Sequence, residues 1–149
     1  MRYFPIFLDL HGRKALVVGG GDIASRKARS LLDAGANVHV VCPELSEEMQ
    51  AMVAAGEVSH EPRRFEPADV EAGYALIIAA TDKQDINREV SELANARGIP
   101  VNVVDQPELC SFIVPSVVNR DPVQVAISTG GASPVLARLL KAQLEAFIP

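Results

Sequence analysis

Apolar runs alternate along the chain with stretches in which apolar residues recur at helical spacing. Short runs that are apolar throughout are typical of strands buried on both faces of a sheet. We predict such strands at residues 15–18, 38–42, 58–60, 74–80 and 101–104. Helices are expected at residues 23–34, 46–55 and 86–97, with Ser46 and Asp85 as the N-caps of the second and third. The polar residues 61–73 are expected to form a loop with one helical turn. This alternation favours an α/β fold with a parallel sheet flanked by helices.

The pattern changes after residue 111. Residues 112–118 and 123–128 are rich in strand-forming residues, and Asn119–Pro122 between them have turn chemistry, so a β-hairpin is expected. Ser133 and Pro134 suit the N-cap and first position of a last helix that runs to about Phe147. We therefore divide the chain into a sheet domain at residues 1–111 and a hairpin plus helix at residues 112–149.

The last helix carries a broad apolar stripe. Its members are Val135, Leu136, Leu139, Leu140 and Leu144. One small domain is not expected to cover such a stripe, so a partner subunit or further downstream residues are needed. We predict a homodimer, because a twofold pair is the default closed assembly.

Composition excludes several classes of protein. The 149 residues are 48% hydrophobic, which is too apolar for a disordered chain. The formal net charge is −5 and no Lys/Arg-rich run occurs, so nucleic acid is not an expected partner. No apolar stretch approaches the ~18 residues of a membrane span, and the N-terminus lacks a signal-peptide pattern. We expect a soluble, cytoplasmic protein without a membrane partner.

Cysteine and histidine residues give no sign of a metal site. Cys42 and Cys110 are expected to be free and largely buried thiols; two cysteines could also form one disulfide. Neither their spacing nor the scattered His11, His39 and His60 matches a metal-ligand set.

A glycine turn joins the first predicted strand to the first predicted helix, in the segment VVGGGDIASRKA. Its spacing is Gly19-x-Gly21-x-x-Ala24. In Rossmann-type folds the first glycine permits a tight turn, the second lets the backbone approach a pyrophosphate, and the small third residue lets helix pack on strand. The N–H groups at the start of the helix then face the phosphates. We predict an NAD or NADP site with contacts from Gly19, Gly20, Gly21, Asp22, Ile23 and Ala24; a glycine turn without a ligand is the alternative.

In Rossmann-type folds an acidic residue about 20 positions after the glycine turn, at the tip of the second strand, usually binds the ribose hydroxyls. This chain has no acidic residue at that tip. Cys42 and Pro43 stand there, and Glu44 follows. We expect contacts from Pro43 and Glu44, through the Glu44 side chain or through the backbone. The choice between NAD and NADP stays open at this position.

Further segments accompany the glycine turn. They are AATD at Ala79–Asp82, NVVDQPELCSFIVPS from Asn102, and VAISTGGASPVLARLL from Val125. In order and spacing the set resembles precorrin-2 dehydrogenase, the sirohydrochlorin-forming module of siroheme synthase. The resemblance implies a Rossmann-type domain, NAD as cofactor, and oxidation of precorrin-2, a tetrapyrrole, to sirohydrochlorin in siroheme biosynthesis. Some members also insert ferrous iron, so ferrochelatase activity with iron as a substrate is a further expectation.

Members of this family usually continue beyond the stretch that matches Val135–Leu144. We therefore expect either a truncated chain or a minimal form of the family, in which residues 112–149 begin a dimerisation and substrate region.

The resemblance implies that Asp105, in the NVVD segment, is the catalytic carboxylate. It follows a predicted strand, at the edge of the sheet where open α/β folds bind ligands, and a carboxylate base suits the loss of a proton. The alternative is a strand-end Asp that caps the turn toward Gln106 and Pro107. Asn102 is expected to hydrogen-bond the cofactor or the backbone. Thr81 and Asp82 are expected to contact the adenosine or ribose, with capping as the alternative.

Hydroxyl and basic residues are candidates for binding the substrate carboxylates. Ser128, Thr129, Gly130 and Gly131 precede a helix N-terminus and are expected to form a carboxylate cradle; a flexible glycine connector is the alternative. Arg120, Arg26 and Lys27 are the main basic candidates, and Arg29 and Arg138 are also considered. A solvated surface charge is the alternative for each of them.

Two other functions compete with the dehydrogenase. A regulatory NAD(H)-binding Rossmann module without catalysis needs the glycine turn, but it needs neither the NVVD nor the STGGASP segment. A scaffold that only carries a tetrapyrrole or a metal would bind without turnover. The joint presence of the three segments favours the dehydrogenase.

Overall fold

A parallel sheet forms the larger of two units in the computed structural model, which describes residues 1–149. The larger unit is Phe7–Phe112, and the smaller combines Met1–Ile6 with Ile113–Pro149. The strands of the sheet are β1 (Lys14–Val18), β2 (Asn37–Val41), β3 (Val58–Glu61), β4 (Leu76–Ala79) and β5 (Val101–Val103). Their order, β3-β2-β1-β4-β5, is the Rossmann order, and the predicted α/β fold is confirmed.

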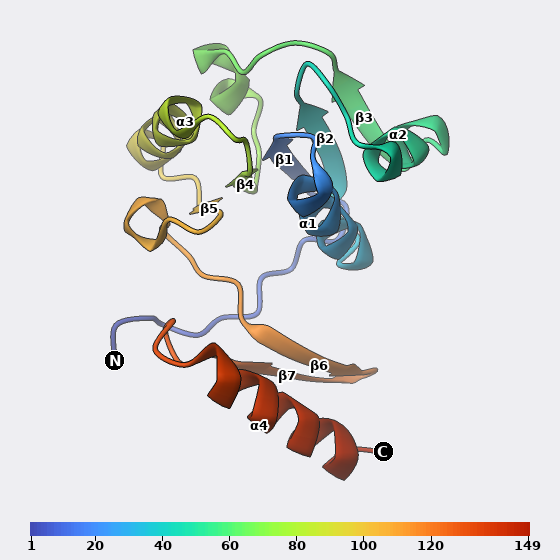
Figure 1. The fold of residues 1–149 in the computed structure, drawn as a ribbon, viewed down its shortest axis with the longest axis vertical. Coiled ribbons are helices and arrows are strands. Elements are labelled where there is room, and N and C mark those ends of the chain that lie inside the picture. Colours follow the sequence, from blue (N-terminus) through green and yellow to red (C-terminus); the bar gives the residue numbers. More distant parts are fainter. The chain divides into compact units, whose positions relative to one another are not determined.

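Helices cover both faces of this sheet (Figure 1). The helices α1 (Asp22–Asp33) and α2 (Glu47–Ala54) lie on one face, and α3 (Gln84–Ala96) lies on the other. The connection between β3 and β4 contains the single helical turn η1 (Pro67–Glu71), and a second short turn, η2 (Pro107–Leu109), follows β5. All of the connections needed for a parallel sheet are therefore present.

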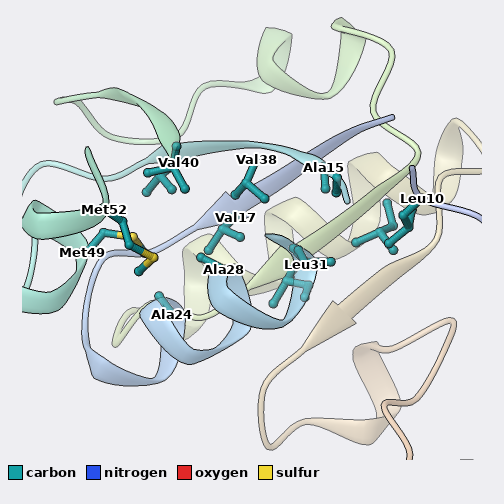
Figure 2. Close-up of a cluster of buried hydrophobic side chains, with 14 residues drawn as sticks. Leu10, Ala15, Val17, Ala24, Ala28, Leu31, Val38, Val40, Met49 and Met52 are labelled. Carbon is teal, nitrogen blue, oxygen red and sulfur yellow. The ribbon is translucent and has the colours of Figure 1, made fainter. Parts of the chain in front are cut away.

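The core beneath α1 and α2 is built from small and aliphatic side chains (Figure 2). Ala24 and Ala28 are fully buried, and they let α1 approach Val17 of β1 closely. Met49 fills the space beneath α2. Leu16 of β1 alternates to the other face, against α3. Full burial of one such large side chain contributes about 1.5–3 kcal/mol to folding.

Two of the expected helix caps are confirmed and one is wrong. The Ser46 hydroxyl accepts the Met49 N–H at 3.2 Å at the start of α2. Ser133 accepts the Leu136 N–H at 3.1 Å in the same way. Asp85 is not the cap of α3, because it lies inside the first turn and Lys83 holds the cap position. The Thr81 hydroxyl accepts the Lys83 N–H, so the residue that orders this helix start lies before the expected one.

The smaller unit contains the predicted hairpin and last helix. They are β6 (Ser116–Arg120), β7 (Val123–Ile127) and α4 (Pro134–Phe147). The turn of the hairpin is shorter than predicted, because Arg120 pairs with Val123 and only Asp121 and Pro122 connect the strands. β6 begins at Ser116 and not at residue 112 as predicted, since Ser116 pairs with Ile127, the last residue of β7.

Neither cysteine is as deeply buried as expected. Cys42 and Cys110 are free, and each is only partly buried. None of the helices has both the length and the apolar composition that crossing a membrane requires. No group of three or more His, Cys, Asp or Glu side chains is placed to hold a metal ion.

Candidate active site and cofactor cleft

Two glycines of the turn are fixed by close packing. A Cβ atom added at Gly19 would lie 2.4 Å from the Ala80 carbonyl oxygen, and the φ angle of Gly19 is 134°, which other residues rarely adopt. A Cβ atom added at Gly20 would lie 2.4 Å from the Glu44 carbonyl oxygen. Both glycines are therefore needed for the turn to fit between β2 and β4.

Gly21 is different, because the space beside it is open. A Cβ atom there would meet nothing within 4 Å, and its φ angle of −82° suits any residue. It is the N-cap residue of α1 and makes no side-chain cap, so Asp22, Ile23 and Ala24 begin a helix whose first N–H groups have no partner within it. An open path in front of these groups fits the pyrophosphate of a dinucleotide.

The residues after β2 pack against the glycine turn. Pro43 and Glu44 are both exposed there. The Cys42 thiol donates to the Glu44 carbonyl oxygen at 3.1 Å, and the Ser46 N–H donates to the Gly20 carbonyl oxygen at 2.7 Å. Burial raises the pKa of the Cys42 thiol above its ordinary value, so the thiol is a donor here and not a thiolate. The Glu44 backbone is thus held against the glycine turn.

The carboxyl end of β4 carries Thr81 and Asp82, beside the glycine turn. Asp82 is exposed and Thr81 is partly buried. Asn87, on the first turn of α3, is 4% exposed and hydrogen-bonds Thr81 three times. Asn87 is not among the site residues predicted from the sequence. Its spacing could have identified it. Asn87 shares the buried face of α3 with Val90 and Ala94, and a polar residue on an otherwise apolar helix face indicates a specific hydrogen-bonding role.

Asp105 follows β5 in an unusual backbone conformation. Its φ angle is 60°, in the left-handed region that Asp tolerates better than most residues. The turn is closed without the carboxylate: the Gln106 N–H donates to the Val103 carbonyl oxygen, and the Cys110 thiol contacts backbone groups of Val103 and Gln106. The Asp105 side chain is exposed. Asn102 points elsewhere, because its amide donates to the Phe112 carbonyl oxygen at 3.1 Å and is 8% exposed.

The sheet brings three of these features to one edge. Val18 of β1 pairs with Ala79 of β4, which pairs with Val103 of β5. Because the strands are parallel and in register, the glycine turn, Thr81 and Asp105 leave the sheet on the same side. A cofactor on the glycine turn and a reacting group near Asp105 therefore share one edge.

A second candidate site lies wholly within the smaller unit. A pocket of about 260 Å³ is lined by Ser128, Thr129, Gly131 and Arg138, among others. The Ser128 hydroxyl accepts the Gly130 N–H at 3.0 Å, and the Thr129 hydroxyl accepts the Ser133 N–H at 3.0 Å. These bonds order the loop beside the N-terminus of α4, and Arg138 gives the pocket a positive charge.

The remaining basic candidates differ in how they are engaged. Arg26 is exposed and Lys27 is partly buried on α1. Arg29 is bound to Glu57 at 2.7 Å, and this pairing neutralises it. Arg120 ends β6, outside the turn where it was expected, and lies 3.9 Å from the Glu145 carboxylate.

Comparisons with known proteins agree with this geometry. A family described as "Putative NAD(P)-binding" matches residues 6–116, and one described as "Sirohaem biosynthesis protein central" matches residues 120–146. The siroheme synthase of Thioalkalivibrio sulfidiphilus is 58% identical over 149 residues, and that of Methylobacillus flagellatus is 54% identical. The solved structure of "SirC, precorrin-2 dehydrogenase" matches with a TM-score of 0.84 and 32% identity, covering 99% of this chain and 72% of that one. The chain belongs to the precorrin-2 dehydrogenase family.

Membership of the precorrin-2 dehydrogenase family confirms the resemblance found in the sequence. It makes the glycine-turn unit an NAD(P)-binding domain. The match to the two siroheme synthases covers all of this chain but only 30% and 32% of their lengths. The chain therefore corresponds to one part of those longer proteins.

Proposed function

We propose that this chain catalyses the NAD-dependent oxidation of precorrin-2 to sirohydrochlorin, a step of siroheme biosynthesis. The observation that carries the proposal is the shared edge of the sheet, where the glycine turn of β1 and the exposed Asp105 beyond β5 lie on one side. A regulatory NAD(H)-binding module has no need for a carboxylate held in a left-handed turn at that edge.

The roles of the chain's own groups follow from their positions. NAD, when bound, supplies the hydride acceptor. The N–H groups of Asp22, Ile23 and Ala24 hold the pyrophosphate at the start of α1. Asp105 accepts the proton that leaves as the hydride leaves the tetrapyrrole, so two hydrogens are lost from the substrate as one hydride and one proton. Pro43, Glu44, Thr81 and Asp82 line the dinucleotide, and Asn102 acts through the backbone that it holds.

Substrate carboxylates are assigned to two sets of groups. In the smaller unit, the pocket of Ser128–Gly131 offers hydroxyls, a helix N-terminus and the Arg138 guanidinium. Arg120 is available there too, because an exposed ion pair at 3.9 Å contributes little and exchanges readily for another carboxylate. In the larger unit, Arg26 and Lys27 are the free cations on α1.

We propose further that the protein is a cytoplasmic homodimer. Apolar side chains of the smaller unit remain exposed along α4, on the hairpin and in the N-terminal segment. They include Phe4, Val117, Val123, Val135, Leu136, Leu139 and Phe147. A second copy of this chain would bury them on a twofold axis. The two free thiols suit a reducing compartment.

Anaerobic incubation of the chain with precorrin-2 and NAD tests the function. We expect the absorbance of sirohydrochlorin to appear with one equivalent of NADH, and to depend on NAD. A regulatory module would bind NAD, measured by calorimetry, and form no product. A tetrapyrrole carrier would shift the spectrum of precorrin-2 without consuming NAD. Iron insertion stays a prediction, tested by adding ferrous iron to the completed reaction.

A further inference from the structure

Asn87 is one of two buried polar side chains of α3, and it bonds to the residue that follows Ala80 beside the glycine turn. It is 4% exposed and lies on the helix face that packs against the sheet. A buried amide without partners would cost about 1–3 kcal/mol, so its hydrogen bonds indicate what it is there to hold.

All three hydrogen bonds of the Asn87 side chain end on one residue. The Thr81 N–H donates to Oδ1 at 3.2 Å, the Thr81 hydroxyl donates to the same oxygen at 2.7 Å, and Nδ2 donates to the Thr81 carbonyl oxygen at 3.0 Å. Both backbone polar groups and the side chain of Thr81 are therefore fixed by a single amide. A helix needs no such clamp for its own stability, because the Thr81 hydroxyl alone accepts the Lys83 N–H at its start.

The clamped peptide is the surface on which the glycine turn packs. The position of a Cβ atom on Gly19 lies 2.4 Å from the Ala80 carbonyl oxygen and 3.3 Å from the Thr81 nitrogen. A shift of the Thr81 peptide would therefore displace the turn that presents the first N–H groups of α1. Small displacements of this kind weaken the binding of a ligand that depends on several aligned donors.

We propose that Asn87 is a positioning residue for the dinucleotide, acting through Thr81 to hold the glycine turn in its binding conformation. The proposal rests on the proposed placement of NAD at that turn. It assigns no contact between Asn87 and the cofactor.

Calorimetric measurement of the Kd for NAD in an Asn87→Ala variant tests the proposal. We expect the Kd to rise about tenfold, the change in an equilibrium constant that corresponds to losing one well-made hydrogen-bonded group. If Asn87→Ala does not fold, Asn87→Asp replaces it; this variant keeps the shape and an acceptor, loses the donor to the Thr81 carbonyl oxygen, and places a carboxylate oxygen against it.

Ser91→Ala is the matched control. Ser91 lies one turn further along the same face, is 3% exposed, and donates to the Leu109 carbonyl oxygen at 2.6 Å, away from the glycine turn. We expect it to lower the melting temperature, because it leaves the Leu109 carbonyl oxygen without its partner, and to leave the Kd for NAD within about twofold. Equal effects of the two variants on the Kd would overturn the proposal.

A double-mutant cycle with Thr81→Val separates a direct effect from one through Thr81. If Asn87 acts through Thr81, the two changes in Kd are not additive. Additive changes would reject a route through the Thr81 hydroxyl, the one partner of Asn87 that valine removes. Unchanged NAD binding in Gly21→Asp would show instead that the cofactor lies elsewhere, so failure of the proposed site is distinguishable from failure of the role of Asn87.

Discussion

Replacing Asp105 by Asn gives the sharpest test of the catalytic assignment. Asn keeps the shape of the side chain but cannot accept a proton at neutral pH. Asp and Asn both tolerate the left-handed conformation that this position adopts, at a φ angle of 60°. The turn itself is closed by Gln106 and Cys110, so the carboxylate has no part in closing it. We therefore expect folding and NAD binding to survive while the chemistry is lost.

The magnitudes separate a base from a turn residue. Losing a general base should lower turnover at least ~100-fold, which corresponds to about 2.7 kcal/mol in the barrier. Asp105→Asn should leave the melting temperature nearly unchanged. Asp105→Ala should lose about 1 kcal/mol because alanine is strained in the left-handed region, and that lowers the melting temperature by roughly 4 °C. Asp105→Gly relieves the strain and should be at least as stable as the natural chain.

The assay combines anaerobic turnover at saturating NAD, the Kd for NAD, and thermal melting of all three variants. A base predicts that turnover falls equally in all of them, whatever the order of their melting temperatures. A purely structural Asp105 predicts that turnover follows stability, with Asp105→Gly the most active. Turnover within about threefold of the natural chain in Asp105→Asn would refute the catalytic role, because a base contributes at least ~100-fold.

Three further predictions concern binding, acid stability and assembly. Gly21→Asp should abolish NAD binding by calorimetry while the melting temperature is kept, because the position is open and Asp is a favoured N-cap; retained affinity would refute the site. Burial opposes ionisation of Asp69, but hydrogen bonds from Arg63 and the Glu66 N–H outweigh it and lower its pKa, so its contribution to stability is present above about pH 4 and is lost as the pH falls further. Asp69→Asn should accordingly melt lower at pH 7 and show a flatter loss of melting temperature on acidification; parallel curves would contradict this. Leu139→Glu, at a side chain that is 57% exposed, should convert a dimer to a monomer by light scattering over a concentration series, and a natural chain that is monomeric throughout would reject the dimer.

Much of the fold was predictable because its signals are local. The glycine turn lies between an apolar run and a helical pattern, and Ser46 and Ser133 stand where caps are needed. What could not be predicted depends on residues distant in sequence. Asp85 was expected to cap α3, but the side chain that orders this helix start belongs to Thr81, which Asn87 holds from within the helix.

The candidate site shows the same division between local and distant signals. The position of Asp105 after a strand was readable, whereas its left-handed φ angle depends on the Cys110 thiol and the Gln106 N–H meeting Val103. Arg29 and Arg26 look alike in the sequence. Only the distant Glu57, which pairs with Arg29, separates them.

The unequal surroundings of the three glycines would divide a saturation library into two groups. In a cell-based screen that selects only for folded protein, nearly every substitution at Gly19 or Gly20 should be depleted. Even the Cβ atom of alanine would lie 2.4 Å from a carbonyl oxygen at either position. Substitutions at Gly21 should persist in that screen and disappear only when growth requires siroheme. Tolerance under the two selections would thus reveal, from sequence counts alone, which glycine is retained for the cofactor and which two for the fold.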